Sequence, residues 1–342
     1  DMERLDEQIG GTLYKVWKVP GAAGNPAART ALMDKLGVDF QFVHSTNGIQ
    51  AFHRARDEVR DMRFALECLA AYNTWAANQT AGHTDRQTPV CYVVLDDVDW
   101  ALGEMQRMRK VGSRMVHIPA QPQAGKSLAH SDFDPVWATA QDLGMAISFH
   151  IAFSGSPMLA PGWGNTGTDW RTALVSFSVH LSQLPIAALT ALVVGGVFER
   201  YPKLIAMAQE LEMGWVPYWL EKLDLVTGAR NIRRTNYTLP LKPSEYVRRN
   251  VFVSNLAPMD TLRPALDQIS PDILVFGSDW PHPEGGEVES AIPTYLGQFA
   301  LDEREKINRF FGDAVRDAMD LPISRSAASA ADKFVANAAA ST

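Results

Sequence analysis

The sequence has little cysteine, which excludes a fold held together by disulfide bonds. Its 342 residues include two cysteines, Cys68 and Cys91, whereas small secreted domains that depend on disulfides are dense in them. Cys91 lies within the apolar run 90–95, a pattern that predicts a buried, reduced thiol. We therefore expect a cytoplasmic protein.

The sequence also lacks a membrane-length apolar run and an excess of positive charge. The longest apolar stretch, 184–198, has about 15 residues, fewer than the roughly 20 that a membrane-spanning helix requires. The formal net charge is −7, and it offers no basic surface for nucleic acid or an anionic membrane. We expect a small-molecule substrate and neither a nucleic-acid nor a membrane partner.

Short apolar runs alternate with helical patterns along most of the chain. The composition, 46% hydrophobic and 21% charged, is that of an ordinary globular protein. Strands are predicted at 38–43, 89–95, 114–118, 146–150, 203–208, 250–254 and 272–277. Helices are predicted at 56–78, 100–110, 214–226, 288–299 and 303–317, with others beginning near 132 and ending near 194. This alternation is typical of parallel α/β architecture.

The pattern favours a (β/α)8 TIM barrel over an open sheet. No glycine-rich phosphate turn follows an early strand, as a doubly wound nucleotide-binding fold would require. A closed barrel needs eight strands and the pattern supplies seven. Residues 12–19 could form another, but proline and glycine crowd its end, so we expect the first strand to lie upstream of Asp1. We expect one barrel domain over 1–322 with long βα loops, and an Ala/Ser-rich C-terminal arm at 323–342.

Polar side chains stand where the predicted strands end. In chain order they are His44, Asp96, His150, Glu210, Asn255 and Asp279. The carboxyl ends of barrel strands surround the active site, and imidazole and carboxylate groups that converge there suit a divalent metal with an open position for water. Each residue alone is weak evidence, because aspartates often stabilise turns and a solitary histidine is more often structural.

The most informative segment is 276–285, in which a buried strand leads into Gly277 and Asp279. Two prolines then stiffen a loop that carries a second histidine, His282. This segment resembles the eighth-strand motif of the amidohydrolase-2 family, in the branch of aminocarboxymuconate-semialdehyde decarboxylase and the resorcylate-type decarboxylases. Further segments that resemble the family are 133–137, 147–150, 195–204 and 214–224. The resemblance covers about residues 27 to 322.

The resemblance implies a metal-dependent hydrolase or decarboxylase that acts on a small organic acid or an aromatic or cyclic substrate. It implies a divalent cation, with zinc expected first and manganese or iron as alternatives. His150 and Asp279 would ligate the metal, and Asp279 could also serve as a base. His282 would hold the substrate or lie beside the metal site. A homo-oligomer, such as a dimer, is also implied, and the C-terminal arm could contribute to it.

Two departures from the family pattern leave alternatives open. The family's opening His-x-His or His-x-x-Glu pattern is absent from residues 1–26, and the segment 208–212 carries Glu210 where the decarboxylases commonly have a histidine. Glu210 is therefore a candidate metal ligand or general base, or else the salt-bridged end of a strand. A di-iron oxygenase on the same scaffold, or a silent subunit that pairs with an active homologue, are the alternative functions.

Weaker candidates lie on loops and helices. Met158 and 163–167 belong to a long glycine-rich loop that could contact substrate or another subunit. The side chain of His117, within a predicted strand, could face either way, and His180 is expected to pack within a helix. His53, Arg54 and Arg56 could bind a substrate carboxylate but more simply begin a solvated helix.

Overall fold

The computed structural model describes residues 21–44, 52, 55–150, 179–180, 182–233, 237–255, 262–269, 271–281, 288–321 and 332. In this part of the chain, seven parallel strands form one sheet whose spatial order is their sequence order. The strands are β1 (Gln41–Val43), β2 (Gln87–Tyr92), β3 (Met115–His117), β4 (Ala146–His150), β5 (Ala206–Gln209), β6 (Val251–Ser254) and β7 (Leu274–Val275). The parallel order confirms the α/β barrel fold.

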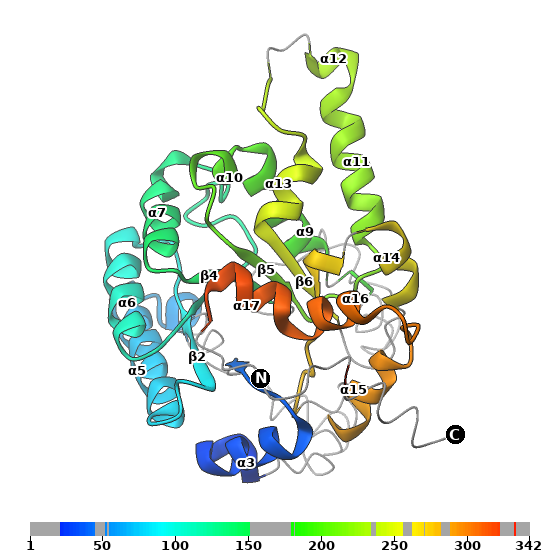
Figure 1. Ribbon diagram of the computed structural model, residues 1–342. Coiled ribbons are helices and arrows are strands. Elements are labelled where there is room, and N and C mark those ends of the chain that lie inside the picture. Colours follow the sequence, from blue (N-terminus) through cyan, green and yellow to red (C-terminus); the bar gives the residue numbers. More distant parts are fainter. Residues whose placement is uncertain are drawn as a thin grey trace, which may run out of the picture.

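Helices follow the strands, and most of them lie outside the sheet, whereas the helix at 314–319 packs with side chains of its inner face (Figure 1). The N-terminal half contains η1 (Gly21–Gly24), α3 (Pro26–Leu36), η2 (Ala55–Val59), α5 (Met62–Thr80), α6 (Val98–Lys110), η3 (Ser131–Phe133) and α7 (Asp134–Asp142). After β4 come α9 (Gln183–Val194), α10 (Val197–Arg200), α11 (Val216–Gly228), α12 (Arg230–Arg233), α13 (Pro243–Asn250), α14 (Leu262–Gln268), η5 (Pro271–Ile273), α15 (Val288–Leu296), α16 (Arg304–Asn308), η7 (Arg309–Asp313) and α17 (Ala314–Met319). None of these described helices has the length and apolar character of a membrane span.

The two faces of the sheet bury different side chains. Cys91, Val93, Val116 and Phe149 pack outward against the helical layer in the larger apolar cluster. Their strand neighbours point the other way, because successive side chains of a strand alternate between its faces. These inward residues, among them Val90, Tyr92, Met115, Ala146, Met207 and Phe252, form a second cluster with α17. By the same alternation, His117, His150 and Gln209 belong to the inner face.

Cys91 is free and fully buried, which confirms the prediction of a buried thiol. Burial raises the pKa of this thiol well above its usual value. The residue therefore packs as a small apolar side chain.

Several element boundaries differ from the prediction for local reasons. The helix predicted at 56–78 is divided, because Arg60 has a positive φ of 59° and the Asp61 side chain then accepts from the Phe64 amide at 3.0 Å to begin α5. The helix predicted at 303–317 is interrupted at Gly312, whose φ is 147°. The last strand is reduced to two residues, preceded by the turn η5. The strand considered at 12–19 lies outside the described residues.

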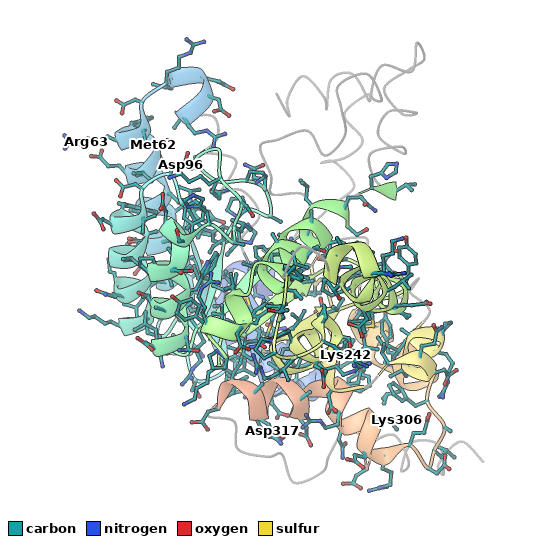
Figure 2. The ribbon with its side chains drawn as sticks, turned by 90° about the horizontal axis from the view of Figure 1, so that it is seen from above. Met62, Arg63, Asp96, Lys242, Lys306 and Asp317 are labelled. Carbon is teal, nitrogen blue, oxygen red and sulfur yellow. The ribbon has the colours of Figure 1, made fainter. Side chains whose placement is uncertain are left out.

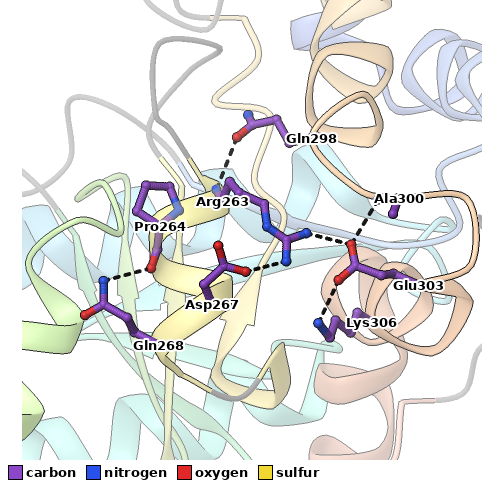
Figure 3. A network of polar contacts seen from close by, with 8 residues as sticks. All are labelled: Arg263, Pro264, Asp267, Gln268, Gln298, Ala300, Glu303 and Lys306. Carbon is purple, nitrogen blue, oxygen red and sulfur yellow. Dashed lines mark hydrogen bonds and ion pairs between the residues drawn. The ribbon is translucent and has the colours of Figure 1, made fainter.

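Charged side chains join the helices at the periphery. Figure 2 shows Arg63, Lys306 and Asp317 at the outer edge of the molecule, and Figure 3 shows Arg263 of α14 between Asp267 and Glu303. The Arg263 guanidinium lies 2.7 Å from the Glu303 carboxylate, which also accepts from Lys306 at 2.7 Å. These contacts join α14 to α16 on the side of the sheet where β6 and β7 lie.

Candidate active site at the carboxyl end of the sheet

Three histidines from separate strands meet at the carboxyl end of the sheet. His44 directly follows β1, His117 ends β3 and His150 ends β4. The ring of His44 lies with its centroid 4.7 Å from that of His150 and 6.3 Å from that of His117. Tyr92 of β2 lies 4.9 Å from the His117 ring. The strand ends therefore gather imidazoles in one place, as expected for parallel strands of a barrel.

Neighbouring side chains fix the ring of His44. Its Nε2 lies 2.9 Å from Gln209 Oε1, and its Nδ1 lies 3.2 Å from the Tyr92 hydroxyl. Ser148 also donates to Gln209 Oε1, at 2.5 Å. Because an amide oxygen accepts only, the proton of His44 belongs on Nε2, and Nδ1 accepts from the Tyr92 O–H. The side chain is thereby fixed in one tautomer.

The environment also keeps His44 neutral. Burial holds the pKa of this imidazole well below its ordinary value, and the nearby His150 and His117 lower it further. The hydrogen bond with Gln209 acts in the opposite direction and is outweighed. Desolvation and like-charge neighbours both disfavour the imidazolium, so His44 acts as a neutral hydrogen-bonding group.

His150 and Glu210, two of the predicted site residues, are in direct contact. His150 Nε2 lies 3.0 Å from Glu210 Oε2, and their side chains are 9% and 12% exposed. Glu210 follows β5 with a positive φ of 59°, and its amide donates to Ser254 Oγ at 3.1 Å. A non-glycine residue in the left-handed region is uncommon and is often found at functional sites. The sharp turn after β5 therefore presents a carboxylate to a strand-end imidazole.

Asp279, the carboxylate after β7, stands on a similar turn with a φ of 52°. The side chain of Asn255 holds the start of this turn: Gly277 N–H donates to Asn255 Oδ1 at 2.8 Å, and Asn255 Nδ2 donates to the Gly277 carbonyl at 2.7 Å. A Cβ at Gly277 would approach Ser254 Oγ to 3.3 Å, which explains the small residue there. Beyond Asp279, the Trp280 amide donates to Ser278 Oγ at 3.3 Å.

Other predicted candidates lie outside this cluster or outside the described residues. His282, Met158, 163–167, His53 and Arg54 fall in the latter group. Asp96 is exposed at the turn before α6, and Arg56 pairs with Asp57 at 2.6 Å. His180 lies in the turn before α9 and is half-buried.

His117 is the residue whose place the sequence left open. It is fully buried and shares the inner face with Met115, two residues before it in β3. Successive side chains of β3 alternate between the two faces of the sheet, so the inward position of His117 follows once β3 is aligned with β2. Three strand-end histidines, rather than two, therefore form the cluster.

The chemistry of the donors suits a divalent metal. Imidazole nitrogen and carboxylate oxygen are the mixed donors that such ions take in hydrolytic sites. His150 and Glu210 supply one of each at the carboxyl end of the sheet. Within the described ranges, no three histidine, cysteine, aspartate or glutamate side chains already stand as a metal-binding group. A metal bound there would lie between His150 and Glu210, in place of their direct contact, and would draw in a further donor.

Comparison with known proteins decides the family. The amidohydrolase family model matches residues 18–318. The chain belongs to the amidohydrolase family. An amidohydrolase from Mycobacterium avium subsp. paratuberculosis K-10 is 25% identical, with a TM-score of 0.73 over 87% of this chain and 75% of that one. The resemblance inferred from the 276–285 motif and its companions is thereby confirmed.

Two decarboxylases share the amidohydrolase fold of this chain. The 5-carboxyvanillate decarboxylase from Sphingomonas paucimobilis is 21% identical, with a TM-score of 0.64 over 86% of this chain and 82% of that one. A dihydroxybenzoic acid decarboxylase from Polaromonas sp., solved with manganese and the inhibitor 2-nitroresorcinol, is 19% identical, with a TM-score of 0.67 and 95% of each chain covered. Both likenesses concern the fold, and they place decarboxylases among the structural neighbours of this chain.

Proposed function

We propose that this protein is a divalent-metal-dependent decarboxylase of an aromatic carboxylic acid. The observation that carries the proposal is the contact between His150 and Glu210 at the carboxyl ends of β4 and β5. His150 Nε2 lies 3.0 Å from Glu210 Oε2. Support comes from the family match over 18–318 and from structural neighbours named as decarboxylases of carboxyvanillate and dihydroxybenzoate. Neither the di-iron oxygenase nor the silent subunit gains support from these observations.

His150, Glu210 and Asp279 would hold the metal. When bound, a divalent cation would supply Lewis-acid polarisation of a substrate oxygen. Relatives solved with manganese include the dihydroxybenzoic acid decarboxylase and a 5-carboxyvanillate decarboxylase from Novosphingobium aromaticivorans. Manganese is therefore the first metal to test, in place of the zinc that the sequence led us to expect first.

The chain's own carboxylates would move the proton. Decarboxylation replaces a carboxylate on the ring with a hydrogen, so an acid must deliver a proton to the ring carbon. We assign this step to Asp279 and Glu210, the carboxyl groups that follow β7 and β5. Neutral His44, fixed by Gln209 and Tyr92, would hold a polar substrate group by hydrogen bonding without adding a positive charge.

Hydrolysis is the second candidate, and Glu210 is the observation that favours it. A glutamate paired with an imidazole at 3.0 Å is suited to accept a proton from an attacking water as a general base. The substrate would then be a small ester, lactone or amide. Decarboxylation needs proton delivery, whereas hydrolysis needs proton removal, so the two candidates differ in the first role of Glu210.

The experiment is a substrate screen on protein loaded in turn with manganese, zinc and iron. Hydroxylated and methoxylated benzoates would be followed by release of CO2 and by ring absorbance, and lactones, esters and amides by product acid. We expect CO2 release with manganese and its loss in H150A. Stoichiometric metal with hydrolysis only would select the second candidate. Absence of bound metal after loading would overturn both.

A further inference from the structure

Helix α3 is fixed to the first described strands by polar contacts. The Asn25 side chain accepts from the Ala28 amide at 3.0 Å and begins the helix. Thr30 Oγ1 lies 3.0 Å from the ring nitrogen of His83, and Gln87 Nε2, at the start of β2, donates to Thr30 Oγ1 at 2.7 Å. The helix is therefore anchored to the turn that leads into β2.

A second anchor comes from Arg86, just before β2. It donates to the Asp34 carboxylate at 2.9 Å and to the carbonyls of Asp39 and Val38 at 2.6 and 2.7 Å. Through these contacts, one side of α3 is held against the segments that lead into β1 and β2.

Arg29 extends from this anchored helix to the opposite edge of the sheet. Its guanidinium lies 4.9 Å from the centroid of the Trp280 ring, and its Nη2 donates to the Ala23 carbonyl at 2.6 Å. The residue is 8% exposed. Burial lowers the pKa of Arg29 to about 10, so the side chain stays charged at neutral pH. A cation over an indole face is attractive, and more so when it is desolvated.

The Arg29–Trp280 contact therefore bridges the two ends of the strand order. Trp280 directly follows Asp279 on the turn after β7, the last strand of the sheet, while α3 precedes β1, the first. The start of the same turn is held by Asn255, which directly follows β6. The turn that carries Asp279 in the left-handed region, at a φ of 52°, is thus held on both flanks.

We propose that Arg29 is a positioning residue for Asp279. By stacking on Trp280 it holds the turn in the conformation in which the Asp279 carboxylate would bind the divalent metal. This inference rests on the proposed function and assigns Arg29 no contact with metal or substrate. The competing explanation is that the Arg29–Trp280 contact only attaches α3 to the turn after β7. Its loss would then lower the stability of the fold and leave metal binding unchanged.

The test compares metal affinity with stability in Arg29 variants. R29M keeps an unbranched, flexible side chain, shorter than that of arginine, and removes the charge, whereas R29K keeps a cation. The dissociation constant for Mn²⁺ would be measured by electron paramagnetic resonance, and the melting temperature on metal-free protein. We expect R29M to raise the dissociation constant about tenfold or more, the size of effect seen when groups that orient metal ligands are removed, and R29K to restore most of the affinity.

Four further variants make the result specific. R86M removes the other anchor of α3 and should lower the melting temperature without changing the Mn²⁺ dissociation constant. W280L should match R29M in affinity, and the double variant R29M/W280L should be no weaker than either, since both remove one interaction. W280F keeps an aromatic face and gives the same comparison against W280L should R29M fail to fold.

The outcomes separate this inference from the proposed function. Wild-type protein that binds no stoichiometric Mn²⁺ would overturn the proposed function and the inference with it. Wild-type binding together with R29M and W280L variants of unchanged affinity would overturn the role of Arg29 alone. A tenfold loss confined to R29M and W280L, with R86M unaffected, would support it.

Discussion

Two polar networks in this molecule differ in how their charges are balanced. Around Arg263, each charge at the α14–α16 contact faces an opposite one: Asp267 and Glu303 accept from the guanidinium, and Lys306 donates to Glu303 (Figure 3). At the carboxyl end of the sheet, His44 is held neutral and one carboxylate, Glu210, pairs with His150.

The difference shows in what each environment does to pKa values. Arg263, Lys306 and the Ala300 amide lower the pKa of the Glu303 carboxyl to about 2. Glu303 therefore stays ionised, and its ion pairs stay intact, at neutral and mildly acidic pH. Burial and neighbouring imidazoles instead lower the pKa of His44 well below its usual value, which keeps donor nitrogens uncharged. The first network joins helices, whereas the second keeps His44 neutral, the state that the proposed metal and substrate binding would require. Four substitutions test this division.

The largest effect is expected at His150. H150A should weaken Mn²⁺ binding at least about a hundredfold, because losing a ligand costs more than losing a group that only orients one. Titration monitored by electron paramagnetic resonance would measure it. The control is H130A, which removes a histidine that is 44% exposed and lies 3.3 Å from the Asp132 carboxylate, and it should leave affinity unchanged. Equal losses in the two variants would remove His150 from the site.

The next effect concerns Asn255, which is 2% exposed and makes both of its hydrogen bonds to Gly277. N255A would leave two backbone groups unsatisfied and should lower the free energy of unfolding by about 1–3 kcal/mol. Urea unfolding would measure it. N78A, at an exposed position of α5, should change the same quantity by less than about 0.5 kcal/mol. A similar value for the two variants would contradict the role of Asn255.

His44 predicts a pH dependence with a definite sign. Its folded pKa lies below the value of 6.5 that the unfolded chain has, so the unfolded chain binds more protons as the pH falls below 6.5. The free energy of unfolding should therefore decrease on acidification, by at most about 1.4 kcal/mol per pH unit from this group. Urea unfolding of metal-free protein at pH 7.5, 6.5 and 5.5 would show it, and H44Q should flatten that slope. A slope unchanged in H44Q would contradict the lowered pKa.

The smallest effect is expected in the peripheral network. E303Q should lower the free energy of unfolding by about 1 kcal/mol at pH 7, since exposed ion pairs contribute little and are screened. The Glu303 pKa is lowered in the fold, so this contribution is present above pH 4.5 and is lost as the pH falls toward 2. The difference between E303Q and wild type should shrink over that window in urea unfolding. A change in Mn²⁺ affinity in E303Q would contradict the separation of the Glu303 network from the strand-end cluster.

The sequence predicted the fold better than the details of the site. Strand β4 was predicted residue for residue, because Ala146 to His150 is a short β-type run that begins soon after Gly144. The division of the helix at Arg60 was missed, since nothing in the pattern signals a positive φ there. His117 was found on the inner face only once the register of β3 against β2 was known. The Arg29–Trp280 contact joins positions about 250 residues apart, and no local pattern predicts such a pairing.

The position of a bound metal tests the proposed site most directly. In a crystal grown with Mn²⁺ we expect one anomalous scattering peak, within bonding distance of His150 Nε2 and of the Asp279 carboxylate. A peak on other residues, with the His150–Glu210 contact undisturbed and Asp279 turned away, would contradict it.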